Sequence, residues 1–102
     1  MIHAIQHKML GLLKGSKSFL IDEDDLVLID AGHSGGCARN VLKMVKGLGM
    51  EPGAIDLCIL THRHRDHVGG LRALKGICDF EVASHSAEAD AIERATRVGV
   101  GL

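Results

Sequence analysis

The stretch that decides the fold spans residues 61–70 and reads Thr61-His62-Arg63-His64-Arg65-Asp66-His67-Val68-Gly69-Gly70. It follows the apolar run of residues 55–60, which predicts a buried strand. Loops at the carboxyl ends of strands in α/β sheets are the usual ligand sites, because the rigid sheet positions the loop. The sequence therefore places three imidazoles and one carboxylate in a loop of that kind.

These four side chains are of types that bind metals. Packed imidazoles repel one another when protonated, and when neutral they carry lone pairs that need partners. A divalent cation satisfies the lone pairs, and this donor set suits zinc, and also iron or manganese. In an extended turn His62 and His64 point the same way, while Asp66 and His67 can face a second ion. The alternative is a cluster of exposed histidines on a solvated turn, but the threonine before and the glycine pair after favour the ordered site.

Working outward, short apolar runs alternate with helical patterns. The predicted strands are residues 2–8, 18–21, 26–29, 55–60 and 80–83, the second and third forming a hairpin around the acidic residues 22–25. The predicted helices are one carrying Val41, Leu42, Val45 and Leu48, one at residues 68–74, and one from Ser84 or Ser86 to about residue 97. Strands separated by helices indicate a mixed α/β sheet with crossover connections.

The remaining histidines have other expected roles. His3 and His7 alternate with apolar residues on the first strand, and we expect both on its exposed face. His33, beside a glycine-rich turn, is a candidate for lining the site. His85 is expected at a helix start or in surface packing.

Composition restricts the class of protein. The chain has 102 residues, 46% hydrophobic and 25% charged, which suits one soluble globular domain. A net charge of −1 argues against nucleic acid or an anionic membrane as a partner attracted by bulk charge. The three cysteines form no CxxC pair, so we expect buried thiols and a cytoplasmic location. No apolar window is long enough for a signal peptide or a membrane-spanning helix.

The string Thr-His-x-His-x-Asp-His-x-Gly-Gly resembles the signature of the metallo-β-lactamase superfamily, and it is most similar to the glyoxalase II-like branch. The resemblance covers roughly residues 2–95. Upstream, Phe19-Leu20-Ile21 and Val27-Leu28-Ile29-Asp30-Ala31-Gly32 look like the first hairpin of the family and its Asp-x-Gly turn. Downstream, Ala83-Ser84-His85 looks like the segment that opens a helix in many members.

The resemblance implies a set of roles. His62 and His64 would bind a first metal ion, and Asp66 and His67 a second, with Asp66 also orienting the catalytic water. Asp30 would hold a ligand loop by hydrogen bonds. The cofactor would be one or two zinc ions, with iron or manganese as alternatives. The implied reaction is attack of a metal-activated water on a small ester, thioester, amide or phosphoester.

The further ligand motifs of the family, a third histidine after glycine, a bridging aspartate and a final histidine, do not occur in this sequence. Residues 1–102 therefore look like one truncated domain, the amino-terminal half of an αββα sandwich: a mixed β-sheet with helices on one face. Its other face would be bare, and we expect homo-oligomers through it. Two functions follow: a metal-dependent hydrolase, or a catalytically incomplete half-domain that binds metal or self-associates without turnover.

Overall fold

The computed structural model of the protein describes residues 1–9, 13–32, 35–61, 70–96 and 98–101. Its strands are β1 (Ile2–Met9), β2 (Leu13–Asp22), β3 (Leu26–Ile29), β4 (Leu57–Leu60) and β5 (Glu81–Ser84). Its helices are α1 (Gly35–Gly47), the 3-10 turn η1 (Pro52–Ala54), α3 (Leu71–Lys75) and α4 (Ser86–Thr96). None of these helices is long and apolar enough to cross a bilayer.

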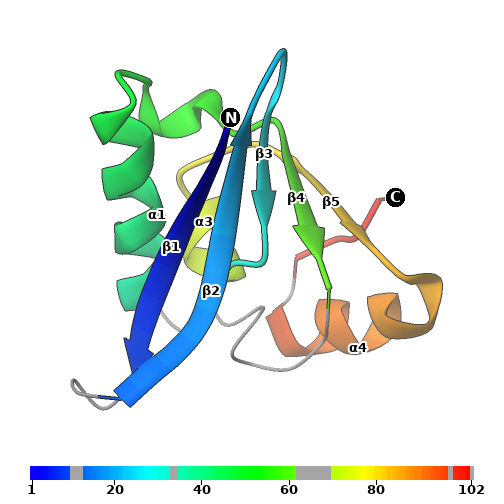
Figure 1. Ribbon diagram of the computed structural model, residues 1–102. Coiled ribbons are helices and arrows are strands. Elements are labelled where there is room, and N and C mark those ends of the chain that lie inside the picture. Colours follow the sequence, from blue (N-terminus) through cyan, green and yellow to red (C-terminus); the bar gives the residue numbers. More distant parts are fainter. Residues whose placement is uncertain (10–12, 33–34, 62–69, 97, 102) are drawn as a thin grey trace.

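The five strands form one sheet in sequence order (Figure 1). β1 and β3 pair antiparallel with β2, whereas β4 pairs parallel with both β3 and β5. Parallel neighbours need a crossover, which α1 supplies between β3 and β4 and α3 between β4 and β5. The predicted mixed sheet with crossover connections is thus confirmed.

The predicted hairpin of the second and third strands is confirmed, but β2 begins earlier than expected. The apolar run starts at Ser18, whereas β2 starts at Leu13 and pairs with the far end of β1, Met9 opposite Leu13. The polar residues 14–17 show no strand pattern in the sequence. They extend because backbone pairing with an edge strand does not require an apolar face.

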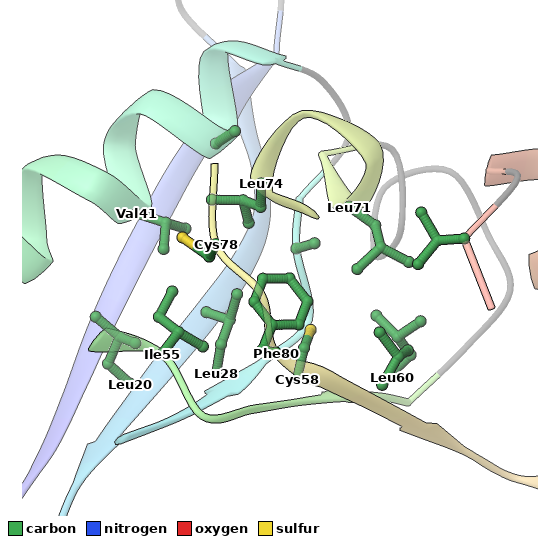
Figure 2. Close-up of a cluster of buried hydrophobic side chains, with 14 of the residues drawn as sticks. Leu20, Leu28, Val41, Ile55, Cys58, Leu60, Leu71, Leu74, Cys78 and Phe80 are labelled. Carbon is green, nitrogen blue, oxygen red and sulfur yellow. The ribbon is translucent and has the colours of Figure 1, made fainter. Parts of the chain in front are cut away.

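The core lies between one face of the sheet and the helices. Its sheet residues include Leu20, Leu28, Cys58 and Leu60, and its residues from helices and connections include Val41, Leu71, Leu74 and Cys78 (Figure 2). Alternation along the strands and helical spacing along α1 bring these side chains together. Full burial of one such leucine is worth about 2 kcal/mol relative to exposure. The helices on one face of the sheet agree with the predicted half-sandwich.

The expected exposure of His3 and His7 was wrong. His7 is fully buried, at 0% exposure, and the Nε2 atom of His3 is buried too. Period-two alternation puts both residues on the same side of β1 as the buried Ile5. That side of β1 faces α1, and residues of α1 contact β1. The outward positions are instead those of Ile2, Ala4 and Gln6.

Candidate metal centre

The predicted ligands His62, His64, Asp66 and His67 lie outside the described residues, as does His33. The structure does describe what holds the ligand loop: Thr61 immediately before it and Gly70 immediately after it. Both of these residues bind the same short turn, Asp30-Ala31-Gly32, which follows β3. This turn is therefore the described part of the candidate centre.

Asp30 fixes the residue that precedes the ligand loop. Its carboxylate accepts two hydrogen bonds from Thr61: the backbone N–H donates to Oδ1 at 2.8 Å and the hydroxyl donates to Oδ2 at 2.7 Å. The N–H of Asp30 donates to the carbonyl of Ile59 at 2.9 Å. With 5% exposure, Asp30 is a buried carboxylate whose two oxygens are both engaged by one partner residue.

The backbone of Asp30 is in the left-handed region, at φ 62°. This conformation is uncommon outside glycine, although aspartate and asparagine tolerate it better than most residues. The three hydrogen bonds to Ile59 and Thr61 offset the conformational cost. The side chain and the backbone of Asp30 therefore act together to join the end of β3 to the end of β4.

Gly32 fixes the residue that follows the ligand loop. Its carbonyl accepts a hydrogen bond of 2.9 Å from the N–H of Gly70. Gly32 also has a positive φ of 79°, and a Cβ atom here would lie 2.3 Å from Cβ of Cys37 and 3.1 Å from Nε2 of His7. Only glycine satisfies both requirements. The geometry of this turn thus depends on close contact with α1 and β1.

Buried polar side chains lie beneath the turn. Nε2 of His7 shares a hydrogen bond of 2.7 Å with the hydroxyl of Ser18, and both residues are fully buried. Cys37, in the first turn of α1, is also buried against Gly32. Sequence reasoning missed His7 as a support of the site. The signal that could have found it is the shared alternation of His3, Ile5 and His7.

Cys58, on β4, lies close enough to Asp30 to respond to its charge. Burial raises the pKa of the Cys58 thiol from its ordinary 9.0 to about 12, and the negative charge of Asp30 adds to the increase. Cys58 is therefore a neutral thiol at physiological pH. Cys37, Cys58 and Cys78 are all buried thiols without a disulfide bond, as the sequence predicted.

The described residues contain no group of three or more His, Cys, Asp or Glu side chains that is placed to hold a metal ion. The donor set of residues 62–67, three imidazoles and a carboxylate, is chemically suited to zinc. Gly32 lies close to its neighbours, and Thr61 and Gly70 on either side of the loop are both hydrogen-bonded to the turn. This arrangement is suited to holding such a loop close to the sheet. On these two observations the residues fit a metal centre.

Known proteins are similar to this chain in sequence and in fold. The sequence profile of the Metallo-beta-lactamase superfamily matches residues 12–100. The chain is 30% identical over 92 residues to "Probable metallo-hydrolase YqgX" of Bacillus subtilis (strain 168), covering 90% of this chain and 41% of that protein. It is 45% identical over 53 residues to a hydroxyacylglutathione hydrolase of Enterobacter sp. (strain 638), covering 52% of this chain and 18% of that protein.

Solved structures give the same result for the fold. A metallo-β-lactamase of Cronobacter sakazakii with a HARLDQ motif superposes with a TM-score of 0.75 at 23% identity, over 91% of this chain and 35% of that chain. MIM-1 from Novosphingobium pentaromativorans superposes with a TM-score of 0.69 at 28% identity, over 76% of this chain and 29% of that one.

This chain spans less than half the length of each of these relatives. The profile nevertheless covers most of its residues, and 91% of the chain superposes on a metallo-β-lactamase structure. The chain therefore belongs to the metallo-β-lactamase superfamily, with similarity to glyoxalase II over about half its length.

Proposed function

We propose that this chain carries the metal-binding loop of a metal-dependent hydrolase that cleaves a small ester, thioester or phosphoester. The observation that carries the proposal is the turn Asp30-Ala31-Gly32, which binds both flanks of a loop containing three histidines and an aspartate. Membership of the superfamily and the names of the relatives, a metallo-hydrolase and a hydroxyacylglutathione hydrolase, support it.

In this proposal His62 and His64 would hold one ion, and Asp66 and His67 would hold a second. Zinc, when bound, lowers the pKa of a water so that a nucleophile is available near neutral pH. Asp66 would accept a hydrogen bond from that water and orient it toward the substrate. Asp30 and Gly32 act on the loop from outside: Asp30 holds Thr61, and the Gly32 carbonyl holds Gly70. Both contacts limit where the ligands can lie.

A thioester is the first substrate to test, because one relative is named as a hydrolase of hydroxyacylglutathione. The second candidate function is metal binding without turnover. It is favoured by the share of each relative that this chain matches, 41% of the Bacillus protein and 18% of the Enterobacter protein. Metal content and turnover, measured on the same preparation, separate the two functions.

The experiment is elemental analysis of protein purified without added metal, followed by assays with a thioester, an ester and a phosphodiester. We expect one to two zinc ions per chain, and His64→Ala to lose most of the metal while its far-ultraviolet circular dichroism stays native. The matched control is His85→Ala, which removes an exposed histidine just before α4 and should keep its metal. Metal with turnover supports the hydrolase, and metal without turnover supports the second function. Unchanged metal in His64→Ala would refute the ligand assignment.

A further inference from the structure

Helix α1 carries three cations in one row on the side turned away from the sheet. Arg39, Lys43 and Lys46 are spaced at i, i+4 and i+7, so they share one side of the helix, and all three are exposed. The opposite side carries Val41 and Val45, which are fully buried in the core. Figure 1 shows α1 at the left margin of the molecule, with the strands on its inner side. The three cations, called the basic row below, therefore face solvent.

The charge of the basic row is not neutralised within the described part of the chain. α1 contains no aspartate or glutamate, and the ion pairs of the described residues do not involve its cations. Like charges at i, i+4 and i, i+3 repel each other and weaken a helix, and Arg39–Lys43 and Lys43–Lys46 are pairs of these two kinds. An anionic partner on this side of α1 would remove the repulsion.

A groove lies beside the basic row, between α1 and η1. Its volume is about 280 Å³, and it is lined by the basic row together with Leu42 of α1 and Pro52 of η1. Leu42 is half-buried and Pro52 is exposed, so both offer apolar surface to a ligand. Lysine and arginine add the apolar methylene groups of their side chains while the charged ends stay in water. The groove therefore combines an apolar lining with cations on one side.

The size of the groove favours an inserted side chain over a small-molecule ligand. Pockets that enclose drug-sized molecules have volumes of about 300–1,000 Å³ and contain convergent polar groups. This groove is smaller than that range. It suits one large apolar side chain, which is the kind of anchor that a helix inserts when it lies in a groove.

The same residues argue against a membrane or a nucleic acid as the partner. Basic segments that bind anionic membranes carry about four to eight Lys or Arg residues, and an amphipathic helix enters the bilayer through its apolar side. α1 has three such residues, and its apolar side is buried in the core. Nucleic-acid sites commonly make about 6–10 phosphate contacts or stack bases on aromatic rings. The residues that line the groove include no aromatic side chain.

We propose that the groove binds an acidic helical segment of a partner protein. The segment would insert one apolar side chain between Leu42 and Pro52 and pair its carboxylates with the basic row. Carboxylates at i, i+4 and i+7 of a second helix match the spacing of the basic row, which spans roughly 10 Å along α1. Arg39 can bind a carboxylate through two parallel hydrogen bonds, and a lysine binds one as a point charge.

The test is fluorescence anisotropy with a labelled helical peptide that carries glutamates at i, i+4 and i+7 and a leucine at i+3. We expect a dissociation constant of roughly 10–100 μM at low ionic strength. Lys43→Glu reverses the charge in the middle of the basic row and should weaken binding about tenfold. Its matched control is Lys17→Glu, the same change at an exposed lysine of β2, and it should bind like the wild type. Both variants change the net charge equally.

A second peptide, with glutamine in place of each glutamate, tests the charge on the wild-type protein alone, so the test holds even if Lys43→Glu does not fold. It should bind at least about tenfold more weakly than the acidic peptide. The proposal is overturned if the two peptides bind equally, or if the acidic peptide does not bind. It is also overturned if folded Lys43→Glu binds like the wild type, or if Lys17→Glu weakens binding as much.

Vesicles containing phosphatidylserine and a single-stranded oligonucleotide are the competing ligands. Tighter binding of either one than of the acidic peptide would also overturn the proposal. A peptide held by the metal centre instead of the groove would keep its affinity for Lys43→Glu. Metal content of Lys43→Glu should equal that of the wild type, so failure of this proposal is distinguishable from failure of the proposed hydrolase.

Discussion

Removing the Asp30 carboxylate should both destabilise the fold and weaken metal binding. Asp30 is buried and accepts hydrogen bonds of 2.8 and 2.7 Å from Thr61. A hydrogen bond to a charged group contributes about 1.5–3 kcal/mol, and the lower value applies here because Thr61 is exposed and water can replace part of each bond. Alanine at φ 62° adds about 1 kcal/mol of strain. Asp30→Ala should therefore cost about 4 kcal/mol.

Milder variants separate these contributions. Asp30→Asn tolerates the left-handed backbone and keeps one acceptor, so it should cost about 1–2 kcal/mol. Thr61→Val removes only the hydroxyl donor and should cost about 1 kcal/mol. Thr61→Ser keeps that donor and should stay within about 0.5 kcal/mol of the wild type. The double variant Asp30→Asn with Thr61→Val should lose less free energy of unfolding than the sum of the losses in the two single variants.

Urea unfolding followed by far-ultraviolet circular dichroism measures these free energies, since the chain has no Trp or Tyr for fluorescence. Zinc affinity is measured on the same proteins by competition with a chelator. We expect Asp30→Ala to lower the affinity about 10- to 100-fold. A cost below about 1 kcal/mol for Asp30→Ala would refute the energetic reasoning. Unchanged zinc affinity would refute the claim that Asp30 positions the ligand loop.

Three further predictions concern the surroundings of the turn. Gly32→Ala should destabilise the protein in urea by about 3 kcal/mol or more, because of strain and overlap with Cys37, whereas Gly49→Ala, also at φ 79° but in open space, should cost about 1 kcal/mol. Raising the pH from 9 toward 12 should lower the stability, because the Cys58 thiol ionises near 9.0 when unfolded but near 12 when folded. Cys58→Ala should flatten that pH dependence. Chelation of the metal should lower the urea midpoint while leaving the native circular dichroism spectrum intact, and a spectrum that collapses would contradict this expectation.

The sequence predicted the parts of this fold that depend on local patterns. Apolar runs at residues 26–29 and 55–60 predicted strands, and the structure has β3 at Leu26–Ile29 and β4 at Leu57–Leu60. Asp30 was identified through the resemblance of its motif, and its two hydrogen bonds to Thr61 became visible only in the structure. The pattern was misleading for His7, because a histidine among apolar residues does not show which face of a strand will be covered.

Contacts between distant segments could not be predicted from local patterns. Gly32 lies against Cys37 of α1 and His7 of β1, and its carbonyl binds Gly70 beyond the ligand loop. These contacts join parts of the chain that are separated by up to about 38 residues, and they exist only when the sheet and α1 are assembled. No spacing within the sequence encodes them.

The turn also determines what a metal ion would have to contribute to the order of the site. Asp30 and Gly32 both have positive φ, at 62° and 79°. Among the described residues, Ile59 and Thr61 hydrogen-bond to Asp30, and Gly32 lies against His7 and Cys37. The core therefore holds the turn, and the turn holds Thr61 and Gly70. Bringing together the two ends of a loop has an entropic cost. In this fold, the hydrogen bonds from Thr61 to Asp30 and from Gly70 to Gly32 already hold the two ends together. Metal binding would then not have to supply that free energy, and it can be tighter than to a loop with free ends.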